Sequence, residues 1–179
     1  EFVDALDLQF DAPVAMATPP GETNRLFVVE LRGRVTVVTN LAVPTRTVLL
    51  DLASTTSIGP EEGILALAFH PNYAVNRRLF VYRTVQGFGE REMRISEFRA
   101  SPQDPNRLEP SETVVLSQTI NTSSHLGGDL RFGPDGYLYG SIGDGAMPYA
   151  NSLQITGGFY SAIYRIDVDS RIGSLPPNP

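Results

Sequence analysis

Short runs of apolar residues recur along the chain, and three of them end in a turn that contains proline. These runs occupy residues 15–18, 67–69 and 130–132, and each leads to a second apolar run, at residues 26–29, 79–82 and 137–139. Residues 93–98 alternate apolar and charged side chains, which is typical of a half-buried antiparallel strand. No segment shows helical periodicity of useful length. The pattern predicts an all-β protein.

The strand, proline turn and strand form a repeated unit. Leu26, Leu79 and Leu138 stand at equivalent places in the three units, and their spacing of roughly 50–60 residues is typical of propeller blades. We expect blade-like repeats at about residues 10–60, 61–120 and 121–175. Three blades leave open edges, so the chain is expected to be a fragment of a longer β-propeller or a half-propeller that assembles with a second copy.

Composition narrows the function classes. The 179 residues are 41% hydrophobic and 19% charged, as in a globular domain, and the net charge of −6 argues against a nucleic-acid partner. No apolar run approaches the ~18 residues needed to cross a bilayer. The absence of cysteine excludes disulfides and thiolate chemistry and is compatible with the periplasm. We expect a periplasmic or secreted protein without a membrane span.

One stretch carries candidate chemistry. His125 stands beside the glycine pair Gly127 and Gly128, just before a strand, a tight turn and a second strand that leads to Asp144. An imidazole at a strand mouth, with a carboxylate returning through a hairpin, fits a general base with its orienting partner. The spacing alone fits a surface-loop histidine followed by an ordinary hairpin equally well.

Several motifs together resemble the glucose/sorbosone dehydrogenase family of soluble quinoproteins, which includes the aldose sugar dehydrogenases. Residues 61–73 (EEGILALAFHPNY), 76–82 (NRRLFVY), 125–145 and 164–169 (YRIDVD) match that family in the same order. The resemblance covers roughly residues 10–175. It implies a six-bladed propeller of which this chain carries about the N-terminal half, with about three four-stranded blades.

The resemblance also implies an activity and a site. It predicts oxidation of an aldose or similar alcohol, with pyrroloquinoline quinone (PQQ) as hydride acceptor and Ca²⁺ as a second cofactor. His125 matches the family's general base, and Asp144 matches the aspartate that holds that histidine in its tautomer. Gly127 and Gly128 would let the backbone approach the flat cofactor. Glu61 matches a side chain that hydrogen-bonds the quinone or the substrate.

Other candidates are assigned structural or solvated roles. We expect Glu62 to be a solvated turn acid, and His70, between Phe69 and a proline, to be a structural residue at a blade turn. Asp167 and Asp169 are two alternating acids at a strand end and are expected to be solvated, since calcium needs six to eight oxygen ligands. The sequence predicts no metal ligand in this chain.

Some positions depart from the family pattern. Ser124 and Leu126 flank the histidine where the family commonly has an Asn or Asp and an amide, and Ser161-Ala162 replaces a Gly-Lys pair. The family's quinone-binding arginines and calcium site belong to later blades. An isolated half is therefore expected to be incomplete as an enzyme, and two further functions stay open: a calcium-dependent lactonase-type hydrolase and a non-catalytic binding module.

Overall fold

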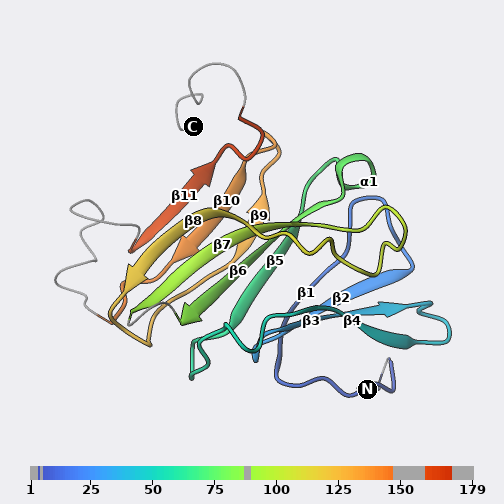
Figure 1. Ribbon diagram of the computed structural model, residues 1–179, viewed down its shortest axis with the longest axis horizontal. Helices are drawn as coiled ribbons and strands as arrows, with labels where there is room; N and C mark the ends of the chain where they lie inside the picture. Colours follow the sequence, from blue (N-terminus) through green and yellow to red (C-terminus); the bar gives the residue numbers. More distant parts are fainter. Residues whose placement is uncertain (1–3, 5, 87–89, 147–159, 171–179) are drawn as a thin grey trace.

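The computed structural model describes residue 4 and residues 6–86, 90–146 and 160–170. Within these residues the chain folds into strands and a single helical turn, α1 (Tyr73–Asn76). The strands form three antiparallel sheets that follow one another along the chain (Figure 1). The prediction of an all-β protein is therefore confirmed.

The first two sheets each contain four strands paired in chain order. The first sheet has the order β1-β2-β3-β4 and the second β5-β6-β7-β8. All pairs are antiparallel, so each connection is a hairpin. Their bounds are β1 (Pro13–Ala17), β2 (Arg25–Glu30), β3 (Arg34–Thr39), β4 (Thr45–Asp51), β5 (Ile64–Phe69), β6 (Arg78–Gln86), β7 (Arg91–Arg99) and β8 (Thr113–Ile120).

The third sheet has three strands among the residues that the structure describes. It contains β9 (Leu130–Phe132), β10 (Leu138–Ile142) and β11 (Ala162–Ile166) in the order β11-β10-β9. β11 ends at Ile166, inside the YRIDVD motif of residues 164–169, and the chain then turns. The first two sheets thus have the four strands expected of a blade, and the described part of the third has three.

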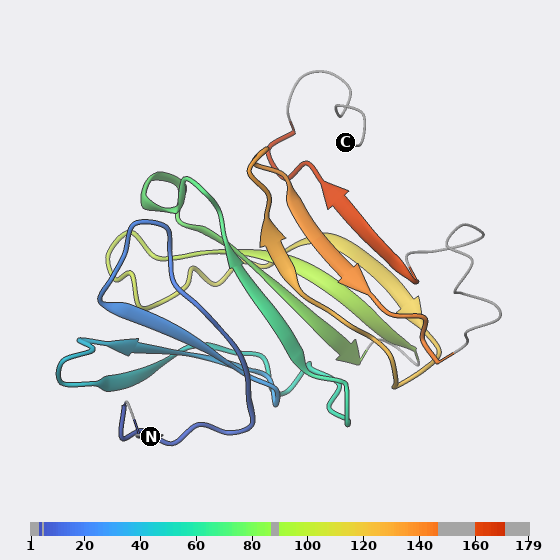
Figure 2. The ribbon, with the colours of Figure 1, turned by 180° about the vertical axis from the view of Figure 1, so that it is seen from behind.

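The first strand of each sheet lies next to the first strand of the following sheet. β1 contacts β5, and β5 contacts β9, and Figure 2 shows these strands along the same side of the molecule. Each is the strand that precedes a proline turn. A groove runs along them and is lined by all three, with Gly128 at one of its ends. This radial arrangement, with the first strands gathered together and the later strands further out, is that of propeller blades.

Two hydrophobic cores separate the three sheets. Alternate residues of β6 enter different cores: Leu79 and Val81 face the first sheet, whereas Phe80 and Tyr82 face the third. Since side chains alternate across a strand, a sheet covered on both faces needs a continuous apolar run, which residues 79–82 of β6 supply. Each fully buried large side chain contributes about 1.5–3 kcal/mol. Packing between sheets therefore fixes how the loops at the strand ends face one another.

Candidate functional site

Glu61, His125 and Asp144 meet at one end of the sheets. Glu61 precedes β5, His125 precedes β9, and Asp144 follows β10. β5 and β9 are both first strands and begin at the same end. β10 is antiparallel to β9 and therefore finishes where β9 begins. The topology brings together three side chains that are far apart in the sequence.

The His125 imidazole is bound to the Asp144 carboxylate. Nδ1 of His125 lies 2.6 Å from Oδ1 of Asp144. The hydrogen bond from His125 is the main cause that lowers the pKa of the Asp144 carboxyl, and a hydrogen bond from the main-chain N–H of Ala146 adds to it. An ionised carboxylate only accepts hydrogen bonds, so Nδ1 carries the proton and donates it. Nε2 is then left as the acceptor nitrogen.

Nε2 of His125 has no hydrogen-bond partner among the described residues, and the imidazole is accessible. The His125 side chain is 56% exposed and that of Asp144 25%. An accessible imidazole with one nitrogen fixed by a carboxylate and the other unoccupied is suited to accept a proton from a bound molecule.

Glu61 contacts the main chain of His125. One carboxylate oxygen of Glu61, Oε2, accepts a hydrogen bond from the His125 backbone N–H. We expected this side chain to contact the quinone or a substrate. In the structure one oxygen holds the backbone that carries the imidazole, and Oε1 has no partner among the described residues. Glu61 is thus beside the candidate base and has an oxygen to spare for a ligand.

The glycines of this region allow close packing of the backbone. A Cβ at Gly128 would lie 2.0 Å from the carbonyl oxygen of Ser141, and one at Gly143 would lie 2.2 Å from that of His125. Gly127 has a φ of +84°, which side chains rarely adopt. The resemblance led us to expect a close approach of the glycine pair to a cofactor. The close approach seen in the structure is to the protein's own β10, which keeps His125 near Asp144.

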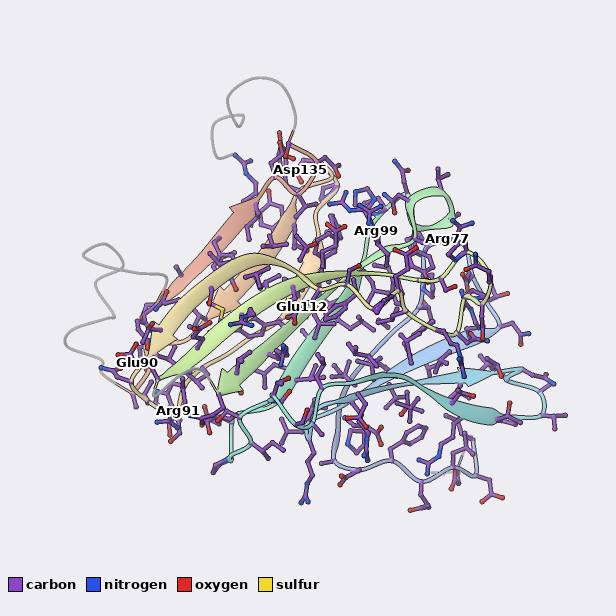
Figure 3. All side chains as sticks on the ribbon, in the orientation of Figure 1. Arg77, Glu90, Arg91, Arg99, Glu112 and Asp135 are labelled. Carbon is purple, nitrogen blue, oxygen red and sulfur yellow. The ribbon has the colours of Figure 1, made fainter. Side chains whose placement is uncertain are left out.

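Glu62 differs from the solvated acid that the sequence suggested. Its carboxylate is buried and lies 2.6 Å from Nη1 of Arg91, and the hydroxyl of Ser57 is 3.3 Å away. Arg91 and Asp135 lie at opposite ends of the sheets (Figure 3). A buried carboxylate needs a cation or several donors, and Arg91, placed by β7, supplies the cation. Glu62 therefore anchors the loop from which Glu61 projects.

His70 and Asp169 form a separate group at the other end of the sheets. Nε2 of His70 lies 3.1 Å from Oδ1 of Asp169, and Nη1 of Arg78 lies 2.5 Å from the same oxygen. Asp169 was expected to be solvated, and this expectation is wrong. The turn after β11 directs its carboxylate to His70 and Arg78 of the second sheet. His70 makes contacts within its turn, as a structural residue would.

Tyr82 was not among the site residues predicted from the sequence, and Leu126 stood out there only as a departure from the family pattern. The Leu126 side chain is fully buried in the core between the second and third sheets, so it does not face the candidate site. Its carbonyl oxygen accepts a hydrogen bond of 2.9 Å from the hydroxyl of Tyr82. Tyr82 sits in an apolar strand, where a tyrosine resembles any other core residue. The sequence signal for its role is the hydroxyl group: side chains alternate along β6, and at this position the side chain points toward the third sheet.

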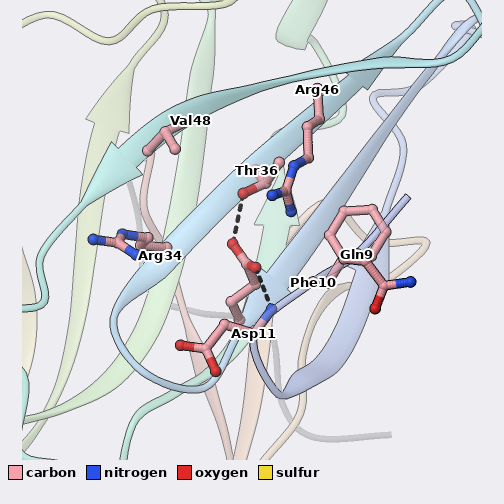
Figure 4. Close-up of a pocket in the computed structure, with 8 residues that line it drawn as sticks. Gln9, Phe10, Asp11, Arg34, Thr36, Arg46 and Val48 are labelled. Carbon is pink, nitrogen blue, oxygen red and sulfur yellow. Dashed lines mark hydrogen bonds between the residues drawn. The ribbon is translucent and has the colours of Figure 1, made fainter.

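A hollow on the first sheet is unrelated to these residues. It lies between the segment before β1 and strands β3 and β4 (Figure 4). Glu30 at its base is buried, with one oxygen accepting from Thr36 and the other from the main chain of Asp11, each at 2.6 Å. Its carboxylate is satisfied within the protein. The hollow thus offers no unpaired buried group to a ligand.

The described residues offer neither a cluster of metal ligands nor a membrane-spanning helix. They contain no group of three or more His, Cys, Asp or Glu side chains that could hold a metal ion. None of the helical structure in the described part is long and apolar enough to cross a membrane.

The fold and site define a class of protein. Residues 10–178 match the family model for glucose/sorbosone dehydrogenases, and the chain belongs to this family. The resemblance inferred from the motifs is confirmed.

Among curated proteins, the chain is similar to Hedgehog-interacting protein. The mouse protein is 32% identical over 177 residues, which cover 92% of this chain and 25% of that protein. HIPL1 protein of Arabidopsis thaliana is 28% identical and aligns with 68% of the chain and 23% of its own length. The chain therefore spans about a quarter of the length of these relatives.

Solved structures confirm the fold. The PQQ-bound aldose sugar dehydrogenase of Streptomyces coelicolor superposes with a TM-score of 0.79 at 22% identity, over 100% of this chain and 51% of that one. The apo-form of the soluble aldose sugar dehydrogenase of Escherichia coli gives 0.77 at 19% identity, over 97% and 49%. The chain is a partial β-propeller that corresponds to about half of each of these proteins.

Proposed function

We propose that this chain supplies the proton-accepting part of an alcohol-oxidising site in a quinoprotein dehydrogenase. The observation that carries the proposal is the 2.6 Å bond between Nδ1 of His125 and Asp144, which leaves Nε2 unoccupied at an accessible strand mouth. An aldose or similar alcohol is the substrate class. Its hydroxyl proton passes to Nε2 of His125 as a hydride leaves the carbinol carbon. PQQ, when bound, accepts that hydride.

Asp144 makes His125 a better base in two ways. The carboxylate fixes the Nδ1–H tautomer, so the unprotonated nitrogen always faces outward. It also places a negative charge beside the ring, which stabilises the imidazolium formed by proton transfer. Because the hydrogen bond from His125 lowers the pKa of the Asp144 carboxyl below its usual value, the carboxylate is charged at neutral pH. The pair is thus ready to act before substrate arrives.

The residues at this mouth fit the proton-transfer step better than they fit cofactor binding. PQQ is anionic and needs cations, whereas Glu61 and Asp144 are both acidic. The arginines near this end are already paired, Arg91 with Glu62 and Arg131 with Asp129. We therefore propose that the cations that bind PQQ and the ligands of Ca²⁺ come mainly from outside this chain. Glu61, Gly127 and Gly128 line the side of His125 that faces the cofactor.

The remaining half of the ring is supplied by further blades or by a second copy. The third sheet exposes Ile163, at 79%, on the face turned away from the second sheet. A further blade packed on this face would cover it, as the third sheet covers the second. We propose that the complete assembly acts as a periplasmic or secreted protein.

Cofactor-dependent dye reduction tests the proposal. The complete protein is loaded with PQQ and Ca²⁺ and offered a panel of aldoses with an artificial electron acceptor. We expect sugar-dependent reduction of the dye that requires both cofactors. A protein that binds PQQ but reduces no dye with any aldose or simple alcohol contradicts the proposal.

A second candidate is a non-catalytic binding module. It is favoured by the 32% identity with a relative named for an interaction, Hedgehog-interacting protein, over 92% of the chain. Ser124, which stands where the family commonly has an Asn or Asp beside the histidine, agrees with it. This candidate predicts that the complete protein takes up no PQQ. No observation among the described residues favours a lactonase-type hydrolase, since they hold no cluster of acidic ligands for a metal.

A further inference from the structure

The Tyr82 hydroxyl makes a long-range contact with the loop that carries His125. Tyr82 lies in β6 of the second sheet and is fully buried, and its hydroxyl donates to the carbonyl oxygen of Leu126 at 2.9 Å. Burial raises the pKa of the Tyr82 hydroxyl above its usual value. The hydroxyl therefore stays protonated and donates throughout the accessible pH range.

This contact fixes the residue directly after the candidate base. Leu126 is held by its side chain in the core between the second and third sheets and by its carbonyl oxygen through Tyr82. His125 itself has a left-handed backbone with a φ of +56°, which is uncommon for a residue with a side chain. Such a conformation persists only where the surrounding structure holds it.

The other contacts of His125 come from different directions. Glu61 binds its backbone N–H from the loop before the second sheet, and the N–H of Gly145 donates to its carbonyl oxygen at 3.3 Å from the third sheet. Tyr82 is the contact made from the interior. Without it the loop is tied by a surface carboxylate and by one backbone bond to Gly145, so the His125 ring can turn relative to the Asp144 carboxylate.

We propose that Tyr82 is a positioning residue that sets the direction of the His125 imidazole. The proposal rests on the proposed function for its effect on turnover, and on geometry alone for its effect on the His125 ring. Removing the hydroxyl leaves the Leu126 carbonyl buried without a donor, a state that proteins avoid. The loop then moves toward water, and Nε2 no longer holds one position over a bound alcohol.

Tyr82→Phe isolates the hydroxyl, because the ring and its packing are kept. The complete protein, labelled with ¹⁵N-histidine, gives His125 signals that are assigned by their loss in a His125→Gln variant. We expect the wild-type signals to report a single Nδ1–H tautomer and the Tyr82→Phe signals to report a mixture. In parallel, kcat for the alcohol should fall about 10-fold with little change in KM, as expected from a misplaced catalytic group.

Tyr73→Phe is the matched control. Tyr73 is also buried, but it belongs to the other core cluster and does not contact the His125 loop. We expect this variant to change neither the His125 signals nor kcat. If both Tyr→Phe variants alter the signals equally, the effect is a general loosening of the fold and Tyr82 has no positioning role.

The two readouts separate failure of this proposal from failure of the proposed function. A protein that oxidises no alcohol still has a His125 tautomer, and an unchanged tautomer in Tyr82→Phe overturns the positioning role whatever the activity. If Tyr82→Phe does not fold, 3-fluorotyrosine at position 82 keeps the ring and the hydroxyl while altering its donor strength. The His125 signals should then shift, and their constancy counts against the proposal.

Discussion

The chain contains two histidine–aspartate pairs, and they lie at opposite ends of the same sheets. His125 and Asp144 join the loops before β9 and after β10, and the His125 side chain is 56% exposed. His70 and Asp169 join the end of β5 to the turn after β11, and the His70 side chain is 5% exposed. Both pairs combine an imidazole with a carboxylate at hydrogen-bond distance, so the chemistry of the two side chains alone does not tell them apart.

The pairs differ in how the two ring nitrogens are used. Nδ1 of His70 accepts hydrogen bonds from the main-chain N–H of Asn72, at 3.0 Å, and from the amide of Asn76, at 2.8 Å. Its Nε2 therefore carries the proton and donates to Asp169. No nitrogen of His70 is left for a substrate, whereas His125 uses one nitrogen and keeps the other. An unoccupied nitrogen marks the functional candidate better than the presence of a carboxylate partner does.

The surroundings of the carboxylates differ as well. Asp169 also binds Arg78, which in turn binds Glu97 at 2.7 Å. This cluster links the second sheet to the third, and its side chains are largely buried. Asp144 accepts hydrogen bonds from His125 and from the main-chain N–H of Ala146, next to the exposed imidazole. We expect the first group to contribute to stability and the second to catalysis.

Replacing the exposed histidine should have the largest effect on activity. His125→Ala removes the proposed base, and turnover of the complete enzyme should fall by about 10²–10⁴-fold. Stability should change little, because the side chain is exposed and its ring packs in no core. Steady-state kinetics and thermal denaturation measure the two effects. Full alcohol oxidation by the alanine variant would end the catalytic assignment and favour the binding module.

Weakening the partner of the base should cost less. In Asp144→Asn the amide oxygen can still accept from Nδ1, but the negative charge that stabilises the imidazolium is gone. We expect turnover to fall by roughly 10- to 100-fold, as when the carboxylate partner of a metal-ligating histidine is lost. The alcohol KM should stay close to that of the wild type. A loss as large as that of His125→Ala would mean that the tautomer, and not the charge, is what Asp144 controls.

Replacing the buried histidine should reverse the pattern. His70→Ala removes the buried acceptor of the Asn72 N–H and the Asn76 amide and one of the donors to Asp169, so the free energy of unfolding should fall by about 2–3 kcal/mol. Turnover measured well below the unfolding temperature should be unchanged. Chemical denaturation of the variant and the wild type gives the difference. A stable His70→Ala protein with impaired turnover would show that the two ends of the sheets are coupled.

The sequence was sufficient to predict the fold because the fold depends on pattern. The repeated strand, proline turn and strand predicted the antiparallel sheets, and the apolar run at residues 79–82 of β6 follows from cover on both faces. The third sheet was harder, since β11 ends at Ile166, inside the YRIDVD motif of residues 164–169. Strand ends depend on where the chain turns, and Asp167 and Asp169 continue the alternation past that point.

Only the part of the candidate site whose residues lie close together in the sequence could be predicted. The hairpin between His125 and Asp144 indicated that they return to one mouth, and the structure places them 2.6 Å apart. The roles of Glu62, Asp169 and Tyr82 depend on partners far away in the sequence: Arg91, Arg78 and the Leu126 carbonyl. Such pairings are set by packing between sheets and leave no periodic trace in the chain.

The smallest expected effect of the series is the loss of stability in acid that comes from the Asp169 and Asp144 carboxylates. Partial burial opposes ionisation of Asp169, but the hydrogen bonds and charges of Arg78 and His70 outweigh it and lower the pKa of the Asp169 carboxyl below 3.8. A carboxyl whose pKa is lower in the folded state adds stability above its unfolded pKa and loses it as the pH falls through the folded value. The Asp169 contribution should therefore be present at about pH 5 and lost toward about pH 3.

Unfolding measured across that pH range tests the assignment. Wild type should lose about 0.5–1 kcal/mol more than Asp169→Asn between the two pH values, a magnitude already reduced for solvent screening. The pKa of Asp144 is also lowered, so Asp144→Asn should show the same sign of effect. Because the His125–Asp144 pair is more exposed, added salt should abolish its share first. If the two variants are equally sensitive to salt, the distinction between the buried His70–Asp169 pair and the accessible His125–Asp144 pair is lost.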